Sequence, residues 1–218
     1  MTKEKYVLGV TGSMSCGKSY VCEKLTELCT EKGITVTNIN LDTLRRDILG
    51  QNPKYSYVRR EIESKFGEAI VCKNGSIDGK IIGEQIFYDQ NAMTDYRNIM
   101  QDPINKRLQE EISDSNGLVL VEWALLAEDK LTSAVNYNVL LVSCSAEEQM
   151  RRLEGGDLGE DQIQKRIDAQ MSNSEKKKEI ETVQTEQGRG VLYEIDTTQG
   201  TTDAKIMKLL INIARELE

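Results

Sequence analysis

One stretch of the sequence combines two glycines, a lysine and a hydroxyl residue in the spacing G-x-x-x-x-G-K-[ST]. Glycines let the backbone turn tightly, so that successive N–H groups point inward at phosphate oxygens. Lys18 is then placed to reach the β- and γ-phosphates of a nucleotide, and the Ser19 hydroxyl to hold Mg²⁺. The residues that we expect to contact the nucleotide are Gly12, Ser13, Met14, Ser15, Cys16, Gly17, Lys18, Ser19 and Tyr20.

Carboxylates at the ends of predicted strands are candidates to work beside this loop. Asp42 follows a strand predicted over residues 34–40, and ligands collect beyond the carboxyl ends of strands in open α/β sheets. We expect Asp42 to accept a proton from an attacking hydroxyl or to order the metal shell. The alternative is that it caps a helix beginning at Thr43, a role that is compatible with the first. Glu122, at the end of another predicted strand, is a candidate to hold Mg²⁺ through water. Glu128 is a weaker candidate, for which a surface helix charge is the alternative.

Composition narrows the possible chemistry. The 218 residues contain no histidine, which excludes histidine-based triads and general bases. The net charge of −8 disfavours a general nucleic-acid binder, and no apolar run approaches the roughly 18 residues that a membrane span needs. We also expect no signal peptide.

Cysteine usage points to a reducing compartment. Five cysteines, an odd number without a C-x-x-C pair, are typical of free thiols in a cytoplasmic protein. Cys22 and Cys29 lie seven residues apart on a predicted helix and are expected to pack in the core. Cys16 is expected to fill the loop as a small residue, with a thiolate beside Lys18 as the alternative.

The order of apolar segments predicts an α/β fold. Short apolar runs that alternate with helical stretches indicate a parallel sheet covered on both faces. A helix is predicted over residues 18–32 and another over 204–217, whereas the run Lys176–Lys178 is interpreted as a solvated helix face. The five predicted strands comprise residues 6–10, 34–40, 118–121, 139–142 and 191–195.

Two polar regions interrupt this alternation. We interpret residues 43–115 as a helical substrate-binding insert and residues 145–188 as a lid with flanking helices. The remaining segments, residues 1–42, 116–144 and 189–218, would form the nucleotide-binding core of a P-loop NTPase or kinase fold with a five-stranded parallel sheet. Movement of the lid would exclude water during transfer.

Landmarks along most of the chain resemble the dephospho-coenzyme A kinases. The opening segment of residues 8–19 is similar to the start of that family, and residues 40–46 resemble its D-A-D-x-x-x-R segment. Further landmarks follow in order: Phe66-Gly67, Gly75-Ser-Ile-Asp78, Ile86-Phe87, Leu120 to Glu128, Gln149-Met-Arg-Arg-Leu153 and Arg166-Ile-Asp-Ala-Gln170.

The resemblance implies a reaction and roles for several residues. The family transfers the γ-phosphate of ATP to the ribose 3′-hydroxyl of dephospho-CoA, the last step of coenzyme A synthesis. It implies that Asp42 acts as base or metal organiser and that Arg46 and Asp78 contact the acceptor. It also implies that Arg152 and Arg166 are lid charges near the phosphates, with Arg152 among the catalytic residues and Arg166 among those that bind substrate.

Several positions depart from the family pattern. The differing residues are Asn40, Gly79, Asp102, Glu122, Ala124, Ala127 and Gly156. The segments expected to bind the nucleotide therefore match the family pattern better than those expected to bind the acceptor. A kinase for another nucleotide-like acceptor, and a nucleotide-binding NTPase or regulatory protein without transfer, remain as alternatives.

Overall fold

The computed structural model describes residues 5–87, 89–154, 163, 167, 168, 170–199 and 203–217. It divides the chain into two compact units, Asn40–Glu110 and a larger unit made of Met1–Ile39 and Glu111–Glu218. The predicted insert overlaps the smaller unit over most of its length. The roles assigned to insert and lid stay predictions.

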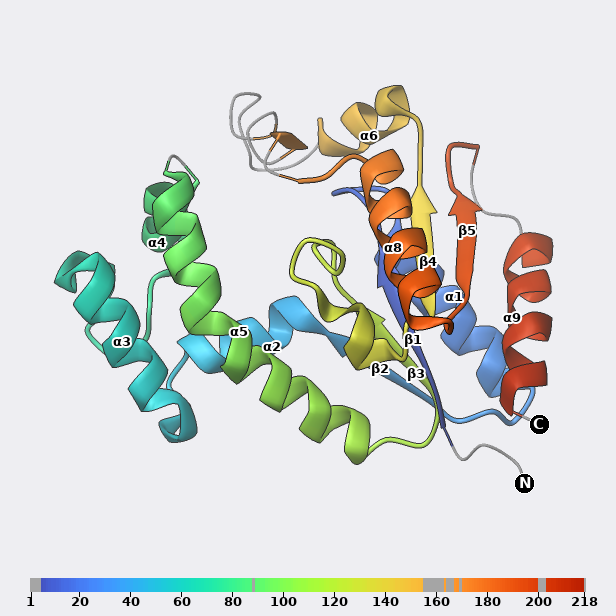
Figure 1. Ribbon diagram of the computed structural model, residues 1–218, viewed down its shortest axis with the longest axis horizontal. Coiled ribbons are helices and arrows are strands. Elements are labelled where there is room, and N and C mark those ends of the chain that lie inside the picture. The colour runs from blue at the N-terminus through green and yellow to red at the C-terminus, as the bar shows by residue number, and fades with distance from the viewer. Residues whose placement is uncertain are drawn as a thin grey trace. The chain divides into compact units, whose positions relative to one another are not determined.

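The larger unit is built around five strands in the order β2-β3-β1-β4-β5 (Figure 1). The first strand, β1, is the central one and pairs in parallel with both β3 and β4. Strand β4 in turn pairs in parallel with β5. The strands are β1 (Lys5–Thr11), β2 (Val36–Asn40), β3 (Gly117–Glu122), β4 (Val139–Ser143) and β5 (Leu192–Asp196). All five strand predictions, and the parallel sheet they imply, are confirmed.

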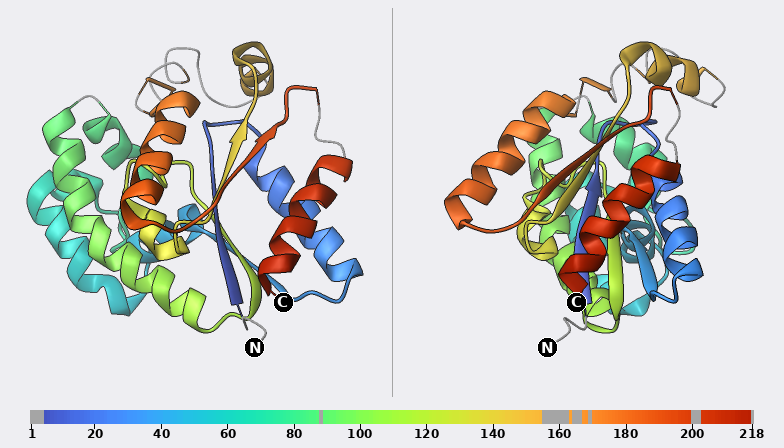
Figure 2. Two further views of the ribbon diagram at one scale, coloured as in Figure 1. Left: turned by 45° about the vertical axis from the view of Figure 1, so that its right-hand side comes forward. Right: turned by 90° about the vertical axis from the view of Figure 1, so that its right-hand side faces the viewer.

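Helices cover both faces of this sheet. Helix α1 (Lys18–Glu31) and helix α9 (Asp203–Leu217) pack on one face, and α8 (Asn173–Gln187) lies on the opposite side (Figure 2). The strands can therefore be apolar on both sides, and every residue from Tyr6 to Thr11 is buried. Cys22 and Cys29, on the inner face of α1, are buried in the core, as predicted. Helix α6 (Ala146–Leu153) follows β4 directly.

The smaller unit is helical. Its core is formed by apolar faces repeating at helical spacing, as at Val58 and Ile62. Its elements are α2 (Leu41–Leu49), α3 (Ser56–Phe66), α4 (Gly79–Ile86), most of α5 (Gln90–Ser113), and the short 3₁₀ helices Pro53–Tyr55 and Glu68–Ile70. A third 3₁₀ helix, Leu131–Val135, belongs to the larger unit.

Candidate functional site

The turn between β1 and α1 has the backbone of a phosphate-binding loop. Gly12 has φ of 142°, and a side chain there would collide with the carbonyl oxygen of Val142. Ser15 (φ 60°) and Gly17 (φ 86°) are also left-handed, and Gly17 is the N-cap of α1. A turn of this kind directs N–H groups inward, and the N-terminus of the following helix adds its positive dipole end. The loop is therefore built to bind an anion.

Lys18 and Ser19 place their functional atoms at this loop. The Lys18 ammonium folds back over it and donates to the carbonyl oxygens of Gly12 at 3.1 Å and Ser13 at 3.0 Å. The Ser19 hydroxyl donates to Glu122 Oε1 at 2.6 Å. The structure thus brings together the two residues that the sequence nominates as metal ligands.

The pair Ser19–Glu122 fits Mg²⁺ chemically. Both side chains offer hard oxygen atoms, and Mg²⁺ keeps several waters and phosphate oxygens besides one or two protein ligands. Within the described parts of the chain, no cluster of three or more His, Cys, Asp or Glu side chains could hold a metal by itself. The arrangement suits an ion that arrives with a nucleotide.

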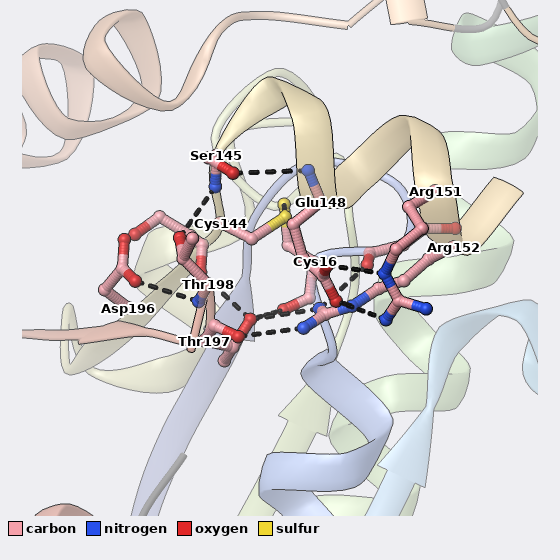
Figure 3. A network of polar contacts seen from close by, with 11 residues as sticks. Cys16, Cys144, Ser145, Glu148, Arg151, Arg152, Asp196, Thr197 and Thr198 are labelled. Atoms are coloured by element: carbon pink, nitrogen blue, oxygen red, sulfur yellow. Dashed lines mark hydrogen bonds and ion pairs between the residues drawn. The ribbon is translucent and has the colours of Figure 1, made fainter. Parts of the chain in front are cut away.

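The guanidinium of Arg152 braces the phosphate loop against β5 (Figure 3). It donates to the Ser15 carbonyl oxygen at 3.2 Å, and to the Thr197 hydroxyl and carbonyl oxygens at 3.0 Å and 2.8 Å. The Thr197 hydroxyl in turn donates to the carbonyl oxygen of Cys16 at 2.8 Å. Most of the Arg152 donors are therefore used by the protein itself.

A carboxylate on α6 orients Arg152. Glu148 accepts from Arg152 Nε at 2.7 Å and also pairs with Arg151. Hydrogen bonds from Arg151 and Arg152 lower the pKa of Glu148 to about 2, so this carboxylate is ionised at neutral pH. Because Glu148 stays negatively charged, its hydrogen bond to Nε keeps the Arg152 guanidinium in one orientation.

Amide side chains hold the other side of the loop. Asn173 Oδ1 accepts from the Ser13 backbone N–H at 3.1 Å and from its hydroxyl at 3.0 Å. Gln170 accepts from the Met14 N–H at 3.3 Å, and Gln149 donates to the Met14 carbonyl oxygen at 2.8 Å. Gln170 before α8 and Asn173, its first residue, therefore support the loop at two successive residues.

A buried ion pair anchors that segment. Lys176 is fully buried on α8 and contacts Glu128, whose side chain is 6% exposed. Lys176 also donates to the Ala124 carbonyl oxygen at 2.8 Å, and Glu128 accepts from the Met171 N–H at 3.0 Å. The prediction of a solvated face is therefore wrong for Lys176, because the pair lets one lysine of the run enter the interior. Glu128 serves this pair and is not a surface charge.

Asp42, Arg46 and Asp78, three of the residues predicted to serve the acceptor, lie in the smaller unit. Asp42 is the second residue of α2 and contacts Arg45 at 3.4 Å. The N-cap of α2 is Asn40, whose side chain accepts from the N–H groups of Asp42 and Thr43. The alternative that made Asp42 the cap of a helix beginning at Thr43 is therefore wrong, because the helix begins two residues earlier.

The other predicted residues are placed as follows. Arg46 is exposed on α2, and the Asp78 carboxylate caps α4 by accepting from the N–H groups of Lys80 and Ile81. Tyr20 is 43% exposed at the start of α1. Arg166, like Gly156, lies outside the described residues.

Some residues at the loop were missed. Gln149 and Gln170 lie in two of the segments that resemble the family, so the sequence carries a signal for them. The sequence carries no such signal for Asn173 and Thr197, because their contacts join positions far apart in the chain.

Comparison with known proteins finds a matching family model and several similar curated proteins. The family model for dephospho-CoA kinase matches residues 6–189. The chain is 28% identical over 183 residues to a dephospho-CoA kinase of Bacillus cereus, with 81% of this chain and 86% of that one covered. It is 30% identical over 182 residues to a dephospho-CoA kinase of Carboxydothermus hydrogenoformans, with 81% and 84% covered.

A solved structure has the same fold. The crystal structure of a Thermus thermophilus protein superposes with a TM-score of 0.71 at 25% identity, covering 99% of this chain and all of that one. In the part of the chain that the structure describes, no helix is long and apolar enough to cross a membrane.

Proposed function

Because the chain belongs to the dephospho-CoA kinase family, we propose that it transfers the γ-phosphate of ATP to the ribose 3′-hydroxyl of dephospho-CoA. The observation that carries this proposal is the phosphate loop, with Lys18 folded over it and Ser19 bonded to Glu122. The family supplies the identity of the acceptor.

The nucleotide binds with Mg²⁺ in this proposal. Residues 12–20 surround the β- and γ-phosphates, and the Lys18 ammonium exchanges its carbonyl partners for phosphate oxygens. Ser19 and Glu122, whose side-chain oxygens lie together, are the residues that would hold Mg²⁺ when it arrives with the nucleotide. The ion neutralises negative charge on the phosphates when it is bound.

Asp42 serves as the base. The 3′-oxygen of the acceptor attacks the γ-phosphorus, the bond to the β-bridging oxygen breaks, and ADP leaves. The hydroxyl proton passes to the Asp42 carboxylate. The chain has no histidine that could act as the base instead. Support comes from the match of Asp42 to the second aspartate of the family segment, and from its position two residues beyond β2.

Three arginines and one aspartate complete the assignment. Arg46 and Asp78 contact the acceptor, and Arg166 approaches the phosphates from the lid, as the resemblance implies. For Arg152 the contacts support a positioning role, because its donors hold Ser15 and Thr197. Its charge remains close enough to the loop to stabilise a bound anion.

An acceptor screen tests the proposal. Purified protein with Mg-ATP is incubated with dephospho-CoA, nucleosides, nucleotides or pantetheine derivatives, and ADP is measured. ADP formed only with dephospho-CoA supports the proposal, whereas faster turnover with another nucleotide contradicts the assigned acceptor. ADP formed equally without acceptor would identify a hydrolase. We place the protein in the cytoplasm, a compartment in keeping with its free cysteines.

A further inference from the structure

Two cysteine thiols face each other, one of them within the phosphate loop (Figure 3). The sulfur of Cys144 lies 3.1 Å from that of Cys16 and donates its S–H to it. Cys16 belongs to the loop itself, and Cys144 follows the last residue of β4. The sheet therefore brings together two thiols that are 128 positions apart.

Solvent reaches one of these two thiols more easily than the other. Cys16 is 1% exposed, whereas Cys144 is partly exposed. Burial, together with the hydrogen bond to Cys16, raises the pKa of the Cys144 thiol to about 12. Cys144 is thus the thiol that a dissolved oxidant meets first, and its reaction near neutral pH is slow because little thiolate is present.

We propose that Cys16 and Cys144 form a reversible disulfide that closes the phosphate loop to nucleotide, with a small-molecule disulfide such as oxidised glutathione as the oxidant. Cys144, as thiolate, attacks one sulfur of the oxidant, its proton having passed to solvent, and one glutathione leaves. Cys16, its proton lost to solvent, then attacks the Cys144 sulfur of the mixed disulfide, and the second glutathione leaves as a thiolate that takes up a proton. The protein loses two protons and two electrons, which together convert one oxidised glutathione into two reduced ones.

The effect on the loop follows from its geometry. A disulfide joins its sulfurs at about 2.05 Å, so the two must approach from 3.1 Å. Cys16 stands between the left-handed residues Ser15 and Gly17, and its carbonyl oxygen is held by Thr197. Drawing Cys16 toward β4 turns the neighbouring N–H groups away from the phosphate. Closure of the loop rests on the proposed function, since it assumes that this loop binds ATP.

The test compares wild type with Cys144→Ser and a control, Cys72→Ser. Cys72 is also partly exposed, but it lies in the smaller unit. Each protein is incubated for hours with excess oxidised glutathione in mildly alkaline buffer. Free thiols are then alkylated, and intact mass, cysteine-linked peptides and Mg-ATP binding by calorimetry are measured. Cys144→Ala provides a second variant in case the serine variant fails to fold.

We expect wild type and Cys72→Ser to lose two hydrogens, to yield one peptide pair joining positions 16 and 144, and to lose at least about tenfold in ATP affinity. Dithiothreitol should restore both mass and binding. Cys144→Ser should form no such link and keep its affinity.

A stable glutathione adduct on Cys144 without the link, or a link that leaves ATP affinity unchanged, would overturn the proposal. Equal loss of binding in Cys144→Ser would do the same. A reduced wild type that binds no ATP would instead contradict the proposed function, and the peptide map would still decide whether the two thiols join.

Discussion

Lys18 is the one residue of the phosphate loop whose side chain brings a full positive charge to it. In the structure its ammonium is held by the carbonyl oxygens of Gly12 and Ser13. These contacts place the charge over the loop before a nucleotide arrives, so little rearrangement is needed on binding. The backbone conformation, by contrast, depends on Gly12 and Gly17 and needs no lysine.

Replacing Lys18 by alanine should therefore abolish turnover and leave the fold intact. We expect kcat for ADP formation to fall by at least about a hundredfold, since one preorganised donor at a developing charge contributes that much. Circular dichroism should remain unchanged. Lys24→Ala, which removes a charge from an exposed ion pair on the same helix, is the control and should retain activity. Turnover at the wild-type rate in Lys18→Ala would exclude the loop from catalysis.

Ser19 and Glu122 should act as a single unit. Their side chains share a hydrogen bond of 2.6 Å, so each variant, Ser19→Ala or Glu122→Gln, disturbs the same magnesium position. Each should raise the Mg²⁺ concentration needed for half-maximal turnover by about tenfold or more, and the double variant should add little. Glu23→Gln, an exposed carboxylate on α1, is the matched control. Additive effects of the two variants would separate the residues functionally.

Helix α8 carries the lysine of a buried ion pair close to the residues that contact the phosphate loop. Its buried Lys176 meets Glu128, and Glu128 also accepts from the Met171 N–H just before the helix. Gln170, one residue before Met171, and Asn173, the first residue of α8, contact the loop. The ion pair is thus expected to set where those two amides lie.

Breaking this pair should destabilise the protein and weaken nucleotide binding together. Lys176→Met leaves the Glu128 carboxylate buried without its cation, which costs about 3–5 kcal/mol in the free energy of unfolding. Urea unfolding measures the loss, and calorimetry measures ATP affinity. Lys177→Met removes a neighbouring lysine from an exposed pair with Glu194 and should change the free energy of unfolding far less, because solvent screens exposed ion pairs.

The double variant Lys176→Met with Glu128→Leu separates stability from positioning. It should recover much of the lost stability, because both charges are gone. ATP affinity should stay reduced, because Met171 loses its acceptor. Full recovery of both quantities would mean that the pair contributes to stability alone.

The sequence predicts the elements of this molecule better than the contacts between them. Each strand prediction lies within two residues of the observed one, because buried parallel strands are short continuous apolar runs. The burial of Lys176 was not predictable, since its partner is 48 positions away and it stands in a run of three lysines. For the same reason Thr197 and Asn173 could not be identified as supports of the loop. Spacing along one segment predicts a helix face or a loop, but not which distant side chain will fill it.

The division into two units separates the residues of the proposed reaction. The larger unit contains the phosphate loop, Ser19 and Glu122, and the smaller unit contains Asp42, Arg46 and Asp78. ATP binding should therefore depend mainly on the first group, and acceptor chemistry on the second. A carboxylate that acts as base contributes only when a hydroxyl is presented to it.

Asp42→Asn should expose this separation. The amide keeps the size of the side chain but cannot take up the proton, so kcat with dephospho-CoA should fall by at least about a hundredfold. The dissociation constant of Mg-ATP, measured by calorimetry without acceptor, should change by less than about threefold, because the loop and its magnesium pair are untouched. Asp95→Asn, which neutralises an exposed ion pair in the same unit, should leave both quantities near wild type. If ATP affinity and kcat fell by the same factor in Asp42→Asn, Asp42 would be an organiser of the bound nucleotide, and the base would have to be sought among the other carboxylates.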